Sequence, residues 1–149
     1  TSSMQTQKMG EILTKELKGG EIICLTGELG SGKTTFAQGV LKGLGAKGPY
    51  TSPTFVVMKQ YGKEIPISKS QYPTKPQNPK SKILNIYHLD AYRVGSKDIL
   101  DLGWEEIVAD KKNIIIIEWA ERIKRIIPKK AIWLEFKHMK EDEREISVK

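Results

Sequence analysis

The amino-acid sequence predicts an α/β fold in which helices flank a central, mostly parallel sheet with antiparallel additions. Apolar segments of strand length alternate along the chain with segments of helical periodicity. A strand, a glycine-rich turn and a helix follow one another within residues 21–45. The continuous β-branched run at 114–117 is typical of a parallel strand covered on both faces. From a length of 149 residues, we expect a single domain over 1–149.

The first helix is predicted before residue 20, because apolar residues there recur three and four positions apart. Ser2 or Ser3 can cap its start, and Gly19-Gly20 is expected to end it. A buried strand at 21–26 and a helix at 36–44 follow. The apolar residues at helical spacing in the first helix are Met9, Ile12, Leu13 and Leu17.

The remaining elements are predicted from alternation, apolar runs and breaker residues. Gly103 is expected to interrupt one helix, and a charged turn at 140–144 to join the last two strands. The predicted strands are 54–61, 83–89, 114–117, 131–136 and 145–148, and the predicted helices are 97–108 and 120–127.

A long, flexible insertion loop is predicted at 62–81. It holds four prolines and several lysines but few large apolar groups, so it cannot bury enough surface to offset its ordering entropy. Residues 61–82 carry five lysines and one acid, which is most of the net charge of +7. The basic excess therefore belongs to this loop and gives only a weak indication of RNA contact.

The composition excludes several classes of protein. No apolar run approaches the roughly 20 residues that a membrane helix needs, and the first residues lack the pattern of a secretory signal. The single cysteine, Cys24, excludes a disulfide framework and is interpreted as a core residue. We therefore expect a cytoplasmic protein with no membrane partner.

Residues 27–34 satisfy the phosphate-loop pattern G-x-x-x-x-G-K-[ST] between a strand and a helix, which predicts ATP or GTP binding. Lys33 can reach the β- and γ-phosphates, Thr34 can ligate Mg²⁺, and Thr35 can bond the α-phosphate. Backbone N–H groups and the positive end of the helix converge on the same phosphates. The expected nucleotide-binding residues of this segment are Glu28, Leu29, Gly30, Ser31, Gly32, Lys33, Thr34 and Thr35.

Such a loop also needs a carboxylate on the magnesium side, at the end of a buried strand. Asp90 and Glu118 both qualify, and the pattern favours Glu118 because its strand is the more apolar. A surface salt bridge is the alternative for either acid. His88 is either a base or ligand, or, by default, a hydrogen-bonded structural residue.

The segment Thr51-Ser52-Pro53-Thr54-Phe55 fits either a nucleotide-sensing loop or a simple turn before a strand. Trp119 fits either core packing or a place beside the nucleotide. His138 stands alone in a charged stretch and is assigned no role.

Taken together, five blocks in this order resemble the TsaE (formerly YjeE) family of ATPases in bacterial tRNA threonylcarbamoyladenosine synthesis. Order and spacing agree over most of residues 4–136. The blocks are GELGSGKTTF at 27–36, TSPTF at 51–55, HLDAYR at 88–93, LGWEE at 102–106 and IEWAE at 117–121.

The resemblance implies a P-loop NTPase domain that uses ATP and Mg²⁺ and acts with two partner proteins, TsaD and TsaB. Those partners attach threonylcarbamoyl to adenosine in tRNAs that read ANN codons, so tRNA contact is expected through the complex. ATP binding and hydrolysis would reset or regulate the TsaD–TsaB assembly. By position, Lys33 and Thr34 match residues that bind phosphate and magnesium. Asp90 and Glu118 match the acidic residues of the metal and hydrolysis site.

The resemblance also reaches residues outside the phosphate loop. Thr54 matches the threonine of a mobile switch loop, Trp119 a tryptophan beside the nucleotide, and Thr6 the N-terminal segment that contacts adenine. Two departures are the insertion itself and alanine at positions 91 and 120, where larger residues or proline are common. Neither removes a functional group, although the insertion can alter partner docking.

Two other functions fit parts of the sequence. A small-molecule kinase shares the phosphate loop, but such enzymes usually add an acceptor site and an arginine-rich lid. The chain has four arginines, at 93, 122, 125 and 144, and its insertion carries lysines instead. Direct RNA binding through the insertion is the other alternative, and it predicts affinity that falls steeply with salt.

Overall fold

The computed structural model describes residues 2–62 and 85–149, so the predicted insertion, apart from Gly62, lies outside the described residues. The first two residues of the strand predicted at 83–89 also lie outside them. The elements are α1 (Ser3–Leu13), the 3₁₀ helix η1 (Thr14–Glu16), β1 (Ile22–Gly27), α2 (Lys33–Gly43), β2 (Met58–Gly62), β3 (Asn85–Asp90), α3 (Ser96–Leu100), α4 (Trp104–Ala109), β4 (Asn113–Glu118), the 3₁₀ helix η3 (Ala120–Ile126), β5 (Ile132–Lys140) and β6 (Glu143–Val148).

The strands form one mixed sheet with the order β2-β3-β4-β1-β5-β6. The four inner strands are parallel, and β2 and β6 add to the two edges antiparallel. The predicted mostly parallel α/β sheet with antiparallel additions is therefore confirmed. The register pairs Leu25 with Glu118 and Asp90 with Glu118. The ends of β1, β3 and β4 thus meet at one edge of the sheet.

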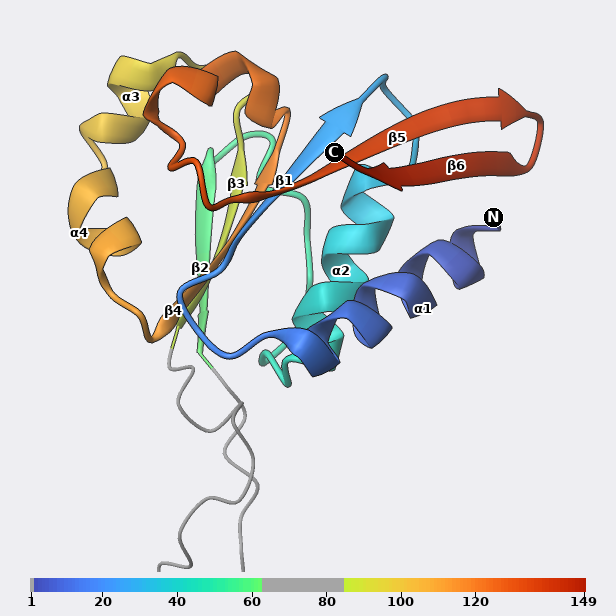
Figure 1. Cartoon of the computed structure of the whole chain (residues 1–149), viewed down its shortest axis with the longest axis horizontal. Coiled ribbons are helices and arrows are strands. Elements are labelled where there is room, and N and C mark those ends of the chain that lie inside the picture. Colours follow the sequence, from blue (N-terminus) through green and yellow to red (C-terminus); the bar gives the residue numbers. More distant parts are fainter. Residues whose placement is uncertain (1, 63–84) are drawn as a thin grey trace, which may run out of the picture.

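Helices cover both faces of the sheet, with α1 and α2 on one side and α3, α4 and η3 on the other (Figure 1). Alternate residues of β4 serve two cores: Ile114 and Ile116 pack with α2, whereas Ile115 and Ile117 pack with Ile99 and the other residues of the opposite side. All six residues of β4 are buried. The sequence-based expectation of a strand covered on both faces is confirmed.

The helices α1 and α2 approach each other so closely that glycine is required at the contact. A Cβ atom at Gly39 would lie 2.0 Å from the carbonyl oxygen of Gln7, and one at Gly10 would lie 2.3 Å from that of Phe36. The helix predicted from apolar spacing is present, and its buried face runs through Thr6 and Gly10. Met9 and Ile12 are 38% and 50% exposed.

Three predicted boundaries differ from the structure. The first helix ends at Leu13 and is followed by η1, so Gly19-Gly20 does not end it. The strand predicted from Thr54 begins at Met58, because Val56 and Val57 donate their N–H groups to Pro53 O and form a turn. The turn predicted at 140–144 is shorter, because β5 and β6 continue as a two-stranded ribbon beyond the rest of the sheet (Figure 1).

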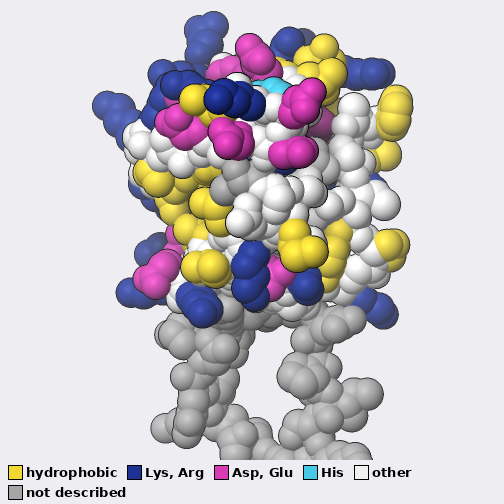
Figure 2. All heavy atoms as spheres, turned by 90° about the vertical axis from the view of Figure 1, so that its right-hand side faces the viewer, with side chains coloured by type: hydrophobic (Ala, Val, Ile, Leu, Met, Phe, Trp, Pro, Cys, Tyr) yellow, Lys and Arg dark blue, Asp and Glu magenta, His cyan; other side chains and the backbone are white. Residues whose placement is uncertain are grey.

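The helix predicted at 97–108 is interrupted at Gly103 as expected, between α3 and α4. No helix in the described parts of the chain has the length and apolar character to cross a membrane. On the face that carries the β5–β6 ribbon, acidic and basic side chains are interleaved (Figure 2). This mixture agrees with the sequence analysis, which places most of the basic excess within the insertion.

Candidate functional site

The phosphate loop connects β1 to α2 and has the backbone that its glycines permit. Gly32 has a φ of 103°, a left-handed conformation that side chains disfavour, and it is the N-cap of α2. Lys33 begins the helix and turns its ammonium back into the loop. Its Nζ donates to the carbonyl oxygens of Gly27 and Glu28, both at 2.7 Å, and to Ser31 Oγ at 3.3 Å.

The electrostatic environment of Lys33 follows from its burial, since the residue is only 4% exposed. Burial lowers the pKa of the Lys33 ammonium, and the nearby carboxylates of Glu118, Glu121 and Asp90 oppose this shift. Nζ also lies 4.0 Å from the ring centroid of Trp119. A cation in this position is held by carbonyl dipoles and a ring face.

Glu118 joins the phosphate loop to β3 through a short chain of hydrogen bonds. Thr34 Oγ1 donates to Glu118 Oε2 at 2.7 Å, and His88 Nε2 donates to Glu118 Oε1 at 2.7 Å. His88 is fully buried, and among the described residues its Nδ1 has no hydrogen-bond partner. This agrees with the structural interpretation of His88 and places the imidazole proton on Nε2.

Asp90 lies beside Glu118 in the register and is also buried. Its Oδ2 accepts from Thr54 Oγ1 at 2.9 Å, and its Oδ1 accepts from the Tyr92 N–H at 2.9 Å. The Asp90 N–H donates to Val57 O at 2.8 Å, so both side chain and backbone hold the segment that precedes β2. Ser52 and Thr54 share a further hydroxyl contact of 2.6 Å.

Two residues that border the site have left-handed backbone without being glycine. Trp119, directly after β4, has a φ of 58°, and Val57 has a φ of 67°. For a β-branched residue such as Val57 this conformation is uncommon and costs about 1–3 kcal/mol. At Trp119 the turn brings the indole against both Lys33 and Tyr92, with the centroids of the Trp119 and Tyr92 rings 4.8 Å apart.

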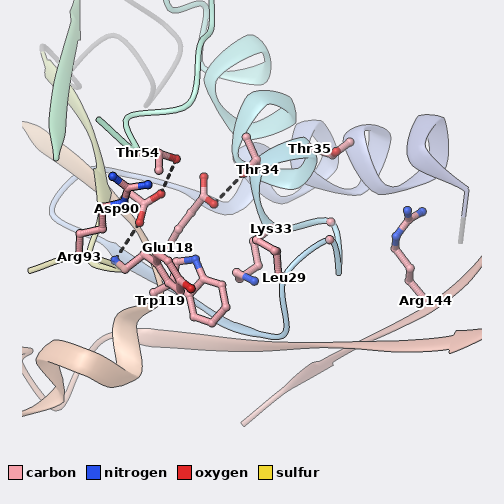
Figure 3. A pocket seen from close by; sticks show the side chains of 13 residues that line it. Leu29, Lys33, Thr34, Thr35, Thr54, Asp90, Arg93, Glu118, Trp119 and Arg144 are labelled. Atoms are coloured by element: carbon pink, nitrogen blue, oxygen red, sulfur yellow. Dashed lines mark hydrogen bonds between the residues drawn. The ribbon is translucent and has the colours of Figure 1, made fainter. Parts of the chain in front are cut away.

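These groups surround a cavity of about 390 Å³ at the carboxyl ends of the parallel strands (Figure 3). The cavity brings together residues from the phosphate loop, both acidic strand ends and the Thr54 segment. Its lining consists of Leu29, Gly30, Gly32, Lys33, Thr34, Thr35, Thr54, Asp90, Tyr92, Arg93, Glu118, Trp119 and Arg144.

Three residues predicted to bind nucleotide do not line this cavity. Ser31 is fully buried behind Lys33, and Glu28 contributes its carbonyl oxygen to Lys33. Thr6 is fully buried in α1, where its hydroxyl donates to Ser2 O. Its methyl group lies beneath Gly32, 3.4 Å from where a Cβ there would be. Adenine contact by Thr6 stays a prediction.

Three lining residues were not among the predicted site residues: Tyr92, Arg93 and Arg144. Tyr92 and Arg93 lie two and three positions after Asp90, so their place just beyond a strand end was a usable signal. Arg93 stacks against the exposed Phe55 ring at 5.2 Å. Arg144 reaches the cavity from β6, far along the chain, and no local pattern marks it.

The oxygen atoms at one side of the cavity fit a magnesium ion bound with a nucleotide. Thr34, Glu118 and Asp90 offer a hydroxyl and two carboxylates, which are hard donors of the kind that Mg²⁺ selects. Within the described residues, no three His, Cys, Asp or Glu side chains are grouped to hold a metal by themselves. This is expected for Mg²⁺, which takes most of its ligands from phosphates and water.

Comparisons with known proteins agree over nearly the whole chain. Residues 1–146 match the family model described as threonylcarbamoyl adenosine biosynthesis protein TsaE. The tRNA threonylcarbamoyladenosine biosynthesis protein TsaE of Treponema pallidum is 30% identical over 148 residues, covering 99% of this chain and 95% of the relative. The protein of the same name from Bacillus subtilis is 30% identical over 143 residues, covering 96% and 78%.

The fold has a counterpart among solved structures. The crystal structure of YdiB from Bacillus subtilis superposes with a TM-score of 0.70 at 25% identity. The match covers 99% of this chain and 80% of that one. The similarity therefore includes both the sheet and the elements that carry the cavity.

Proposed function

Because the chain belongs to the TsaE family of tRNA threonylcarbamoyladenosine biosynthesis proteins, we propose that it binds and hydrolyses ATP with Mg²⁺ in support of that modification. The site is the cavity between the phosphate loop and the acids Asp90 and Glu118. The observation that carries the proposal is the contact between the Thr34 hydroxyl and the buried Glu118 carboxylate. It joins the loop that would hold phosphate to a buried acid whose carboxylate also interacts with the ammonium of Lys33 and accepts a hydrogen bond from His88.

The phosphate loop would hold the nucleotide through its backbone N–H groups and Lys33. Lys33 Nζ would exchange its contacts with the loop carbonyls for the β- and γ-phosphate oxygens. The exchange replaces dipoles by full negative charges, so it strengthens the interaction of a buried ammonium. Thr34 and Glu118 would hold Mg²⁺ beside the phosphates, where the ion would supply positive charge that offsets the negative charge of the phosphates.

The two acids would have different roles. Glu118 lies within hydrogen-bond distance of Thr34, so we assign it, with the Thr34 hydroxyl, to the magnesium side. Asp90 is held by Thr54 and the Tyr92 N–H at the edge of the cavity. We propose that Asp90 orients the attacking water. The hydrogen bond from Thr54 to Asp90 would couple the conformation of the 51–57 segment to the state of the site.

The partners that we propose are TsaD and TsaB, in the cytoplasm, with tRNA reached through their complex. The proposal is supported by the lining of the cavity, whose phosphate-loop residues and carboxylates suit a nucleotide with magnesium. Hydrolysis would therefore serve to reset the assembly between turnovers. The chain would not transfer the group itself.

A turnover experiment tests this proposal. Purified chain is mixed with TsaD, TsaB, threonylcarbamoyl donor and substrate tRNA, and modified tRNA is counted per TsaD in the presence of ATP or a non-hydrolysable analogue. We expect many turnovers with ATP and about one with the analogue, and Lys33→Ala should behave as the analogue does. Multiple turnovers without hydrolysis would refute the proposal.

A further inference from the structure

The β5–β6 ribbon delivers Arg144 to the phosphate loop, on the side away from the two acids. Arg144 lines the cavity together with Gly30, Gly32 and Thr35. The Cδ and Nε atoms of Arg144 lie 3.2 and 3.4 Å from the position that a Cβ atom on Gly32 would occupy. The arginine therefore packs directly over this glycine. In Figure 3, Arg144 lies beyond the loop from Asp90 and Glu118, on the side toward which Thr35 points.

A β-bulge in the ribbon contributes to the direction in which the Arg144 side chain points. The pairing of β5 with β6 shifts register between His138 and Lys140, directly across from Arg144 and Glu143. Such bulges bend a strand and redirect the side chains beside them. Arg144 shares the inner face of β6 with Ile146, which packs against the core, while Glu143 and Glu145 are exposed.

The orientation of a bound nucleotide follows from the loop. Lys33 and the Thr34–Glu118 pair mark the β- and γ-phosphate end, because the phosphate-loop lysine would contact those phosphates and the hydroxyl and carboxylate would hold the magnesium. The α-phosphate and nucleoside must then leave the loop past Thr35, which is the side of Arg144. A guanidinium there meets phosphate and ribose oxygens with several donors in a fixed plane.

We propose that Arg144 is a nucleotide-binding residue that contacts the α-phosphate–ribose end of the nucleotide. The inference rests on the proposed function, since it presumes a nucleotide in the cavity. The new element is that the β5–β6 ribbon, through Arg144, takes part in binding the nucleoside end of the nucleotide. Because ATP and ADP share this end, Arg144 strengthens the binding of both nucleotides to the same degree.

The test compares Arg144→Ala and Arg144→Lys with Lys140→Ala. Lys140 is exposed on the same ribbon and does not line the cavity, so its removal matches the charge lost. Affinities for ATP and ADP are measured by equilibrium titration at two salt concentrations. We expect Arg144→Ala to weaken the binding of both nucleotides about tenfold or more, as for a lost charge-assisted hydrogen bond, with the unfolding midpoint nearly unchanged. Arg144→Lys should recover part of the loss, and Lys140→Ala should bind as the wild type does.

Two results would overturn the inference. Nucleotide affinity within twofold of wild type in Arg144→Ala would show that the arginine makes no contact. Weakening of ATP without weakening of ADP would place it at the γ-phosphate instead. Failure of the wild-type chain to bind either nucleotide would refute the proposed function itself, which keeps the two failures distinct.

Discussion

The close contact between α1 and α2 predicts that any side chain at Gly39 lowers the stability of the fold. In Gly39→Ala the new Cβ would lie 2.0 Å from the carbonyl oxygen of Gln7 and 2.9 Å from its carbonyl carbon. Both atoms belong to the backbone of α1, so no side-chain rotation relieves the overlap. The helices would have to separate by about 1 Å to restore ordinary contact.

Overpacking of this kind costs about 1–3 kcal/mol, with larger values when backbone must move. Alanine returns up to about 1 kcal/mol through its helix propensity. We therefore expect the free energy of unfolding to fall by about 1–2 kcal/mol, measured by urea titration followed by circular dichroism. Gly62→Ala is the control, because no described residue lies within 4 Å of its Cβ position, and it should stay within about 0.5 kcal/mol of wild type. A Gly39→Ala variant as stable as wild type, or more stable, would refute the close-contact reasoning.

Four further predictions concern the site and the core. Asp90→Ala and Glu118→Ala should lower ATP hydrolysis about a hundredfold while changing ATP affinity less than tenfold, and normal turnover in both would contradict the assignment. His88→Phe should remove the donor that orients Glu118 and lower kcat about tenfold at similar KM, whereas His88→Gln should retain more activity; equal loss in KM and kcat would argue against this role. Burial lowers the pKa of Lys33 in the folded state, so between the folded and unfolded pKa values the unfolded state binds more protons. The free energy of unfolding without nucleotide should therefore rise with pH in that range. Urea titrations of Lys33→Met should not show this rise. Burial raises the pKa of the Cys24 thiol to about 12, so alkylation at pH 8 should proceed at the rate of unfolding and slow when Mg²⁺ and ATP are added; rapid labelling of native protein would contradict its burial.

Local patterns predicted most of the sheet. The apolar run at β4 and the glycine-rich turn after β1 determine their own conformations through burial and backbone freedom. By contrast, α1 has its apolar residues Met9 and Ile12 on a largely exposed face. The buried face is chosen by Gly10 and Gly39, whose fit depends on two helices meeting in space. Periodicity within one helix carries no information about that meeting.

Some residues of the candidate site could likewise be predicted from local patterns, whereas others could not. Lys33 and Thr34 lie within one contiguous motif, and Asp90 and Glu118 each end an apolar strand, so the sequence predicted that they would meet at one edge of a parallel sheet. The structure places all four around one cavity. Arg144 was hidden because its charged neighbours at 140–143 suggested a turn, whereas they lie in a ribbon that leaves the sheet. Its approach to Gly32 is set by tertiary packing alone.

The central claim is that residues 27–34 hold ATP through Lys33. An isothermal titration of ATP into the wild-type chain and into Lys33→Ala, each with Mg²⁺ at constant salt, tests it most directly. We expect saturable binding of one ATP per chain in the wild type and at least a hundredfold weaker binding in the variant, a loss of about 2.7 kcal/mol or more in binding free energy. Equal affinities in the two proteins, or no binding by the wild type, would contradict it.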